Sequence, residues 1–464
     1  MTITLLPFGA TPSPRQLAWH ALEYYGFLHF TVNTFTDREW GLGNESPHLF
    51  HPSHFSATNI VETAQLGGMR GLILTAKHHD GFCLWPSHHT THSVANSPWR
   101  DGQGDVVGEL ARTCAAAGMK FGIYLSPWDR NHPAYGHADY IEYYHAQLRE
   151  LLSNYGPLFE VWFDGANGGD GYYGGSYERR QIDNTTYYPW ERTFALVREL
   201  QPNACIFSDA GPDVRWVGNE QGIAGDPCWS TLTRDGLFPG AADPTLLNQG
   251  LRHGADWVPA ECDVSIRPGW FYHAHEDQQV RTAENLLDLY LASVGRGANL
   301  LLNLPVTPAG RIHEHDRAAL IAFRTLRERL HANDMTQHAR IELSSAFGGN
   351  RTGIADILRT DEDTCWIPDP IDTTPYVVAR FAQPTRINLV DLREYLPLGQ
   401  RVDAFSVEVA AQSGWHVVAQ CQSIGNRRLV RIPNSVTTGI RVRFHRSAAP
   451  VALRSFRIYD CELW

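Results

Sequence analysis

The sequence predicts an α/β protein, with a TIM-like (β/α) barrel domain over residues 1–335 and a C-terminal all-β sandwich domain over residues 336–464. Between residues 26 and 305, short apolar runs alternate with helix-like segments. Polar residues recur directly after those runs, and the helical pattern stops at about residue 330. At 464 residues the chain exceeds what one hydrophobic core usually serves, so two domains are expected.

The barrel strands are expected in runs that are apolar almost throughout, as buried parallel strands are. These runs are residues 26–32, 71–76, 120–125, 158–163, 204–207, 256–259 and 297–302. Helices are expected at residues 59–66, 105–117, 138–154, 189–200 and 276–294. Gly118 and Gly156 should end two of them, because glycine readily takes the left-handed backbone of a helix C-terminus.

Polar side chains follow the predicted strands and point to a single site. They include His29, His78, His79, Tyr124, Ser126, Asp164, Ser208, Asp209, Glu261 and Asn303. In a (β/α) barrel the strand ends converge on one rim, so these residues should gather around one pocket. An open doubly wound sheet is the alternative fold, but no G-x-G-x-x-G or GxxxxGK[ST] motif follows any of the strands.

The C-terminal segment has the two-residue period of half-buried strands at residues 405–409, 415–419, 428–432 and 440–444. A sandwich of roughly 100 residues is the expected form. We expect it to brace the barrel, although such domains can also bind sugars.

Composition and charge exclude several classes of partner. The formal net charge is −11 and no basic run offsets it, so nucleic acid is not an expected partner. No apolar run approaches the roughly 18 residues of a membrane-spanning helix. Residues 1–11 lack a basic start followed by an apolar stretch, which predicts a cytoplasmic protein, or a periplasmic or secreted one if a signal was removed. The sequence does not predict an oligomeric state.

The eight cysteines lie far apart and form no CxxC motif, so most are expected to be buried thiols rather than disulfides or zinc ligands. No cofactor is expected. The 14 Trp and 18 Tyr residues often lie beside Gly, Pro, Asp or His. Flat aromatic faces beside polar groups suit the C–H face and hydroxyls of a sugar, although any single Trp is more often part of a core.

Asp164 ends the apolar run LFEVWFD and is followed by Gly165. An ionised carboxylate at the mouth of an apolar strand is costly unless it is paired or needed for chemistry. The alternative is a capping or turn aspartate.

The segment at residues 211–220 is expected to be a loop after the fifth strand, and it carries Asp213, Arg215 and Glu220 among large apolar residues. Glycosidic cleavage commonly uses one carboxylate as nucleophile and a second, with a raised pKa, as proton donor. Asp164 and Glu220 could fill these roles. The alternative for Glu220 is a solvated loop acid.

His78, His79 and Asp80 suggest a metal site, and a metal-dependent hydrolase using them is the rival hypothesis. Neighbouring residues on a strand point to opposite faces, so the two histidines should not share one ion, and no H-x-H or H-E-x-x-H motif accompanies them. No metal is therefore expected. Neutral imidazole can both donate and accept a hydrogen bond, so His29, His78 and His79 suit sugar hydroxyls, although one of the pair could be structural.

Seven segments in this order together resemble the retaining α-L-fucosidases of glycoside hydrolase family 29. They are LHF at 28–30, EWG at 39–41, TAKHHDGF at 75–82, YLS at 124–126, WFDG at 162–165, GPDVRWVGNE at 211–220 and SIRPGWFY at 265–272. The sixth segment is similar to the subgroup that is selective for α-1,3/1,4-linked fucose.

The resemblance implies a role for each matching residue. Asp164 would be the nucleophile, with Tyr124 beside it, and Glu220 rather than Asp213 would be the acid/base. The residues that the resemblance implies for fucose binding or for lining the pocket are His29, Trp40, His78, His79, Arg267 and Trp270. The expected substrate partner is a fucosylated oligosaccharide of Lewis type.

The implied reaction is double displacement, with the two carboxyl groups about 5–5.5 Å apart. The Gly/Tyr-rich stretch 165–188 is extended relative to the family pattern, and we expect it to reshape the acceptor side of the site. Another exo-glycosidase on the same barrel, or a lectin-like protein that kept only the sugar pocket, are the remaining alternatives.

Overall fold

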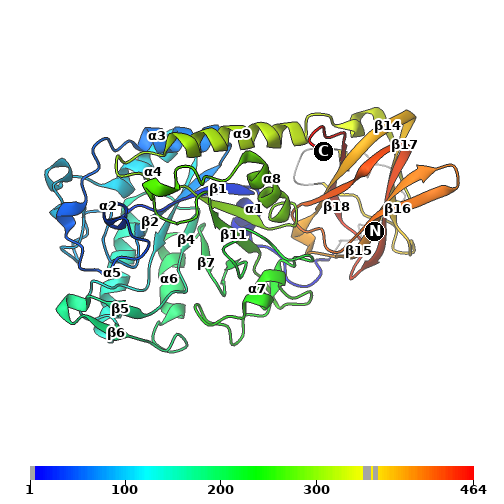
Figure 1. Cartoon of the computed structure of the whole chain (residues 1–464). Coiled ribbons are helices and arrows are strands. Elements are labelled where there is room, and N and C mark those ends of the chain that lie inside the picture. Colours follow the sequence, from blue (N-terminus) through cyan, green and yellow to red (C-terminus); the bar gives the residue numbers. More distant parts are fainter. Residues whose placement is uncertain (1–5, 348–356, 359–363) are drawn as a thin grey trace.

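The computed structural model describes residues 6–347, 357–358 and 364–464 (Figure 1). Of residues 1–11, on which the prediction about an export signal rests, the structure therefore describes only those from residue 6 onward. The structure is a closed eight-stranded parallel barrel followed by an antiparallel β domain, which lies at the right in Figure 1, and the predicted fold class is confirmed. No helix among the described residues is long and apolar enough to cross a membrane.

The barrel closes because β1 pairs in parallel with both β2 and β12. In chain order its strands are β1 (Tyr24–Leu28), β2 (Gly71–Lys77), β3 (Lys120–Leu125), β4 (Glu160–Trp162), β7 (Cys205–Ser208), β8 (Val214–Trp216), β11 (Ala260–Ser265) and β12 (Asn299–Asn303). The longer helices are α3 (Ala57–Leu66), α4 (Val106–Ala116), α5 (Asp139–Asn154), α6 (Trp190–Leu200), α8 (Ala283–Ala292) and α9 (Glu314–Leu330). Gly118 and Gly156 have positive φ values of 68° and 77°, as expected directly after helices α4 and α5.

Shorter elements decorate this frame. They are α1 (Pro14–His20), α2 (Asn33–Thr36), α7 (Pro244–Gln249), the pair β5 (Gly169–Gly171) and β6 (Glu178–Arg180), and the pair β9 (Thr231–Leu232) and β10 (Asp256–Trp257). The β5–β6 pair lies within the Gly/Tyr-rich stretch 165–188. None of the eight cysteines, all of which lie among the described residues, forms a disulfide, and six of them are buried.

Two strand predictions are wrong. Residues 256–259 do not enter the barrel, because β10 pairs with β9 outside it, and the seventh barrel strand is β11 instead. The sixth strand, β8, lies inside the segment that was expected to be a loop. Its buried Arg215 interrupts the apolar pattern, and its guanidinium donates to the carbonyls of Leu247, Val258 and Trp229. These bonds offset part of the cost of burying the charge.

One predicted helix begins later than expected. Residues 276–294 were expected to be helical, but α8 begins at Ala283. The Thr282 side chain accepts from the backbone N–H of Asn285, which caps the helix at this point.

The barrel interior is filled by large side chains rather than open. Fully or nearly buried residues from several strands form one cluster at its centre: Tyr25, Phe27, Ile73, Tyr124, Trp162, Phe207, Val214 and Leu301. A second and larger cluster fills the space between the strands and the outer helices. The barrel is therefore a packed core and not a pore, so a site must lie outside its interior, as at the rim where the strands end.

The C-terminal domain contains β13 (Ala339–Leu343), β14 (Tyr376–Glu394), β15 (Val402–Ala411), β16 (Gly414–Cys421), β17 (Arg428–Ser447) and β18 (Leu453–Tyr459). The strand order is β13-β14-β17-β15-β16, and β18 also pairs with β14. Register shifts divide β14, so that its first part pairs with β13 and its last part with β18, while both parts contribute to one core. Residues 428–432 and 440–444, predicted as two strands, form one strand of 20 residues, because Pro433 lies at an exposed position that the pairing tolerates.

The β domain is bonded directly to the barrel. The backbone N–H of Leu429 donates to the Gly295 carbonyl at 3.0 Å, and the Asn426 amide donates to the His20 carbonyl at 3.0 Å. Glu23, which directly precedes β1, pairs with Arg393 of β14 at 2.7 Å. The β domain thus meets the barrel at the end where β1 begins, opposite to the rim where the strands end.

We expect Leu301→Ala to lower the free energy of unfolding by about 2–5 kcal/mol, because Leu301 is fully buried at the barrel centre and its loss leaves a cavity. Denaturant unfolding followed by tryptophan fluorescence measures the change. Leu251→Ala is the matched control, since this leucine is 38% exposed and its loss should change the value by no more than about 0.5 kcal/mol. Equal losses in the two variants would contradict the packed interior.

Candidate active site

A cavity of about 460 Å³ lies at the rim where the barrel strands end. Eight of the nine predicted site residues line it: Asp164, Glu220, His29, Trp40, His78, His79, Tyr124 and Trp270. They come from segments that are far apart in the sequence, and the barrel brings them to one place.

Asp164 follows β4 and is held by two hydrogen bonds. The Tyr124 hydroxyl donates to Oδ2 at 2.8 Å and the backbone N–H of Ala166 donates to Oδ1 at 2.8 Å. Burial raises the pKa of Asp164, and these two bonds oppose that rise. The side chain is 24% exposed, so the carboxylate remains accessible from the cavity. A Cβ atom on Gly165 would lie 2.4 Å from Asp209 Oδ2, which explains why glycine follows Asp164.

Glu220 lies on the exposed side of the same cavity, in the loop after β8. The loop follows the sixth barrel strand and not the fifth, because β8 was not predicted. The Trp270 indole N–H donates to Glu220 Oε2 at 3.2 Å. Partial burial raises the pKa of Glu220, the Trp270 bond opposes this, and the charge of Asp164 adds to the rise. The two carboxyl groups are therefore close enough to interact, and both have raised pKa values.

His29 is neutral and presents an acceptor to the cavity. The Asn303 amide NH₂ donates to Ser265 Oγ and to the Trp270 carbonyl, so its Oδ1 must accept from His29 Nδ1–H, at 2.8 Å. Burial lowers the pKa of His29 to about 3. The proton is thus fixed on Nδ1, and Nε2 can accept a hydrogen bond from a hydroxyl group.

His79 is fixed in the same way. The Ser126 hydroxyl donates to the Trp128 carbonyl at 2.7 Å, so Ser126 Oγ accepts from His79 Nδ1–H, also at 2.7 Å. Burial lowers the pKa of His79 to about 3, and its Nε2 lies 3.7 Å from Asp164 Oδ2. Both atoms are hydrogen-bond acceptors. A ligand hydroxyl placed between them could therefore donate its single proton to either one.

The sequence argument that His78 and His79 point to opposite faces of a strand, and so cannot share a metal, is wrong. β2 ends at Lys77, so strand alternation does not apply, and the two rings lie 4.1 Å apart and line the same cavity. Asp80 nevertheless cannot join them, because its carboxylate is buried and accepts from the Thr31 hydroxyl and the backbone N–H of Phe82, both at 2.7 Å. The three residues do not converge on one point.

Two tryptophans form walls of the cavity. Trp40 is 53% exposed and packs edge-on against His79 and Trp128. Trp270 lies 5.2 Å from the His29 ring, measured between centroids. Aromatic faces beside neutral imidazoles and carboxylates are the surroundings that a sugar ring requires.

Arg267 is the exception among the predicted site residues, and the expectation that it lines the cavity is wrong. Its guanidinium is buried, and it donates to Asp316 of α9 at 3.0 Å and to Asp277 at 2.8 Å. Arg267 shares a loop with Trp270, but its side chain points to the outer helix. It anchors this loop to the barrel instead of contacting the cavity.

Several residues that line the cavity were not predicted as site residues. They are Phe27, Glu39, Trp162, Phe207, Trp216 and Asp263, whereas Asp209, which also lines the cavity, was expected among the strand-end residues. Trp216 donates from its indole to Asp263 at 2.8 Å, and burial raises the pKa of Asp263 well above its usual value, to which the charge of Glu220 adds. Asp263 could have been found from sequence, since residues at every second position of a strand share a face and Asp263 lies two after Glu261.

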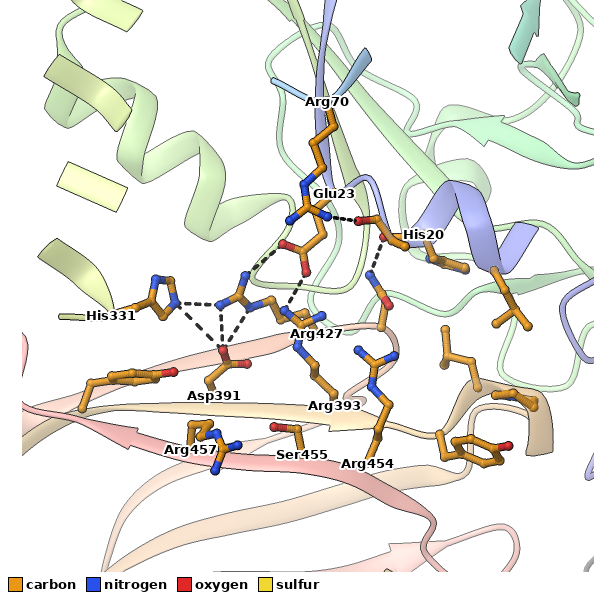
Figure 2. Close-up of a pocket in the computed structure, with 17 residues that line it drawn as sticks. His20, Glu23, Arg70, His331, Asp391, Arg393, Arg427, Arg454, Ser455 and Arg457 are labelled. Carbon is orange, nitrogen blue, oxygen red and sulfur yellow. Dashed lines mark hydrogen bonds and ion pairs between the residues drawn. The ribbon is translucent and has the colours of Figure 1, made fainter. Parts of the chain in front are cut away.

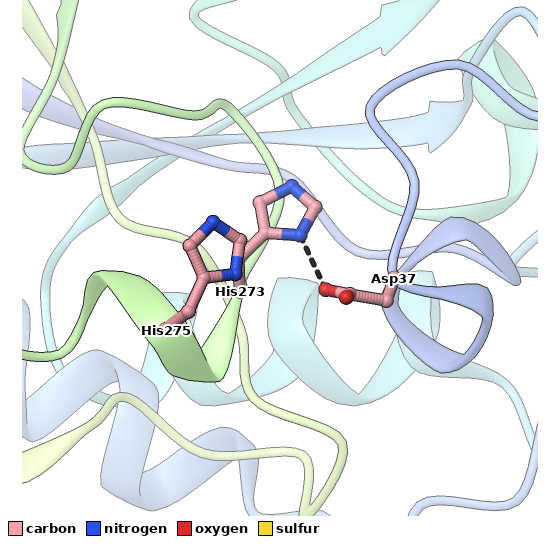
Figure 3. Close-up of side chains that lie close together, drawn as sticks. All are labelled: Asp37, His273 and His275. Atoms are coloured by element: carbon pink, nitrogen blue, oxygen red, sulfur yellow. Dashed lines mark hydrogen bonds and ion pairs between the residues drawn. The ribbon is translucent and has the colours of Figure 1, made fainter.

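Glu39, Asp37, His273 and His275 form a cluster of ionisable side chains at the edge of the cavity, part of which is shown in Figure 3. His273 is held by Asp37 at 2.5 Å and by Glu39 at 2.7 Å, one carboxylate on each ring nitrogen. Burial alone would lower its pKa, but the two carboxylates outweigh burial and raise it. With one carboxylate on each ring nitrogen, His273 has no nitrogen left for a metal, so we interpret the cluster as an ion pair.

This ion pair supports the cavity wall. The backbone N–H groups of Trp270 and Phe271 donate to the two Glu39 oxygens at 2.8 and 3.0 Å. His273 thus fixes Glu39, Glu39 fixes the backbone of Trp270, and Trp270 contacts Glu220.

Comparisons with known proteins agree with this geometry. The family model described as alpha-L-fucosidase matches residues 15–324. Alpha-L-fucosidase 1 from Arabidopsis thaliana is 42% identical over 435 residues, covering 93% of this chain and 83% of the relative. A putative alpha-L-fucosidase from Bacteroides thetaiotaomicron superposes with a TM-score of 0.90 at 34% identity, covering 98% of this chain and 99% of the other. A Ruminococcus gnavus glycoside hydrolase family 29 fucosidase in complex with fucose superposes with a TM-score of 0.90 at 28% identity, covering 100% of this chain and 97% of the other. The chain therefore belongs to the α-L-fucosidases of glycoside hydrolase family 29.

Proposed function

We propose that this α-L-fucosidase releases α-1,3- or α-1,4-linked L-fucose from Lewis-type oligosaccharides by double displacement, with Asp164 as nucleophile and Glu220 as acid/base. One observation carries the proposal: two interacting carboxyl groups line one cavity in different surroundings. Asp164 is held from behind by Tyr124 and Ala166, whereas Glu220 lies on the exposed side against Trp270.

In the first step, Asp164 attacks the anomeric carbon and forms a covalent glycosyl ester. Glu220 gives its proton to the glycosidic oxygen as that bond breaks, so the acceptor sugar leaves as a neutral alcohol. The raised pKa of Glu220 favours the protonated form that this step requires. The hydrogen bonds from Tyr124 and Ala166 stabilise the ionised Asp164 that the attack requires.

In the second step, Glu220 removes a proton from water, and the resulting nucleophile attacks the anomeric carbon and expels Asp164. Two inversions give net retention of configuration. The exposure of Glu220 supports this role, because the water must arrive from the side that the acceptor has left.

Recognition of fucose is assigned to the neutral histidines and the aromatic walls. The Nε2 atoms of His29 and His79 are acceptors for ring hydroxyls. Phe27 and Phe207 at the base of the cavity offer an apolar surface to the C6 methyl group that distinguishes fucose from hexoses with a 6-hydroxyl.

The linkage preference rests on the similarity of residues 211–220 to the α-1,3/1,4-selective subgroup. Gly165, Ala166, Gly240 and Ala242 line the cavity near the Gly/Tyr-rich stretch 165–188, and their small side chains leave room for a branched acceptor. We assign this side of the cavity to the acceptor sugars.

Asp164→Gly should lower kcat/KM by at least about a thousandfold, because the covalent step has no substitute nucleophile. External azide should restore part of the turnover on an aryl fucoside and give a β-fucosyl azide, detected by NMR. Asp235→Gly, at an exposed loop position outside the cavity, is the matched control and should keep full turnover. An Asp164→Gly enzyme with unchanged turnover would exclude Asp164 as nucleophile.

Glu220→Ala should lower turnover by about 10²–10⁴-fold on oligosaccharides and much less on an aryl fucoside whose leaving group needs no proton. In the unsubstituted enzyme, kcat/KM should fall as pH rises through the raised pKa of Glu220, because the proton donor is then lost. It should also fall as pH drops below the pKa of Asp164, because the nucleophile is then protonated. The alkaline limb should disappear in Glu220→Ala.

The control for this variant is Glu62→Ala, an exposed glutamate on α3, which should leave both the turnover and the pH profile unchanged. The acid/base assignment fails if Glu220→Ala keeps full turnover on a poor leaving group.

Incubation with Lewis-type trisaccharides, 2′-fucosyllactose and an aryl fucoside tests linkage and stereochemistry together. We expect the trisaccharides to be cleaved faster than 2′-fucosyllactose, and ¹H NMR should show the α-anomer of fucose first. Preference for 2′-fucosyllactose would contradict the linkage proposal but not the mechanism, whereas β-fucose as the first product would contradict double displacement.

A further inference from the structure

A second cavity, of about 490 Å³, lies where the barrel meets the β domain (Figure 2). Glu23 and Arg70, which directly precede the barrel strands β1 and β2, line its barrel side. Residues of β14, β18 and the segment before β17 line its other side. The cavity is thus at the opposite end of the barrel from the active site, and both domains are needed to form it.

The lining is strongly basic. It contains two carboxylates, Glu23 and Asp391, and five arginines: Arg70, Arg393, Arg427, Arg454 and Arg457. This excess of positive charge occurs in a chain whose formal net charge is −11. Guanidinium groups keep their charge at all working pH values, so the cavity attracts anions throughout that range.

Both carboxylates are engaged by arginines. Glu23 pairs with Arg393 at 2.7 Å and with Arg427 at 2.9 Å, and Asp391 pairs with Arg427 at 2.7 Å. Glu23 does so from a left-handed backbone conformation with a φ of 56°, which is strained for a residue other than glycine. These pairs account for Arg393 and Arg427. Glu23 also interacts electrostatically with Arg70, but it is already paired with two other arginines, and the Arg70 guanidinium donates to the neutral carbonyl of Ala21 at 2.7 Å.

His20 adds a buried donor that lacks an acceptor. It lines the cavity, is 1% exposed, and its Nε2 accepts from the Trp257 indole N–H at 3.2 Å. Burial lowers its pKa to about 3, so the ring is neutral and its single proton is on Nδ1. This N–H finds no partner among the described residues. A buried donor without an acceptor is costly, and an oxygen-rich ligand would satisfy it.

We propose that this cavity binds the phosphate group of a small phosphomonoester, with Arg70 and Arg454 as the principal guanidinium ligands and His20 as an additional donor. A tetrahedral dianion matches the forked donors of arginine and accepts several charge-assisted hydrogen bonds at once. In Figure 2, Arg454 extends from β18 toward the arginines and His20 of the other segments.

The size of the cavity favours an ester over free phosphate. Its volume falls in the range of sites for small organic ligands and is much larger than one phosphate ion needs. Leu17, Leu396, Pro397 and two tyrosines, Tyr395 and Tyr459, also line it and supply contacts for an organic part. Because the ligand would contact both domains, binding should stabilise their junction without competing with fucosides at the other end of the barrel.

The test uses the full chain, with inorganic phosphate, glucose 6-phosphate and adenosine 5′-monophosphate as probes and glucose and adenosine as uncharged controls. At constant ionic strength, calorimetry should show saturable binding of phosphate and tighter binding of at least one ester. The thermal unfolding midpoint should rise with the same saturation, and turnover of an aryl fucoside should not change. Saturable binding of phosphate alone, with no gain from either ester, would overturn the phosphomonoester assignment.

Arg70→Gln and Arg454→Gln should each weaken binding about tenfold or more, since each removes a charge-assisted contact. Arg340→Gln makes the same change of charge at a side chain that is 84% exposed and is not part of the cavity lining, and this variant should bind as the unsubstituted protein does. Fucosidase turnover in each variant shows that it has folded. Equal binding in all three variants, or a response that never saturates, would overturn the proposal.

Tungstate, a tetrahedral dianion, gives a measurement that needs no variant. In crystals of the unsubstituted protein soaked with tungstate, anomalous density is expected between Arg70 and Arg454. Density only at other surface positions would overturn the assignment even if both variants failed to fold.

Discussion

Closure of the barrel is the constraint on which the rest of the structure depends. β1 bonds to β2 on one side and to β12 on the other, so eight strands that are spread over some 280 residues end on the same rim. Large side chains fill the interior beneath the rim, and the polar side chains that follow the strands line a cavity above it. This is why Asp164 and Glu220 share one cavity although 56 positions separate them in the sequence.

Within that cavity, burial shifts pKa values, and the direction of the shift differs between histidines and carboxyl groups. It keeps His29 and His79 neutral, and their hydrogen bonds to Asn303 and Ser126 decide which nitrogen carries the proton. It raises the pKa of both carboxyl groups. His273, whose two ring nitrogens each contact a carboxylate, is not part of the cavity lining and acts through Glu39 on the position of Trp270. Burial therefore favours hydroxyl recognition in the interior, whereas the two carboxylates around His273 make the wall at the edge rigid.

The sequence was most informative where apolar runs end in one polar residue, as at Asp164, and there both strand and site position follow from the pattern. It failed at β8 and β11, because the buried Arg215, Glu261 and Asp263 interrupt the apolar pattern that marks a strand. The direction of Arg267 depends on Asp316 of a distant helix, which no local spacing encodes. The basic cavity was not foreseen either, since its arginines are scattered over the sequence and each alone resembles an ordinary surface charge.

The two long strands of the C-terminal domain determine the order in which the protein can mature. β14 pairs with β17 along most of its length, and β18, which completes the basic cavity, is the last strand of the chain. On the ribosome, the barrel sequence emerges well before any of these long-range pairings can form. Until the C-terminal domain has been made, it cannot cover the barrel end near Glu23, and it arrives as a late cap on a chain whose strand-end rim has already been translated.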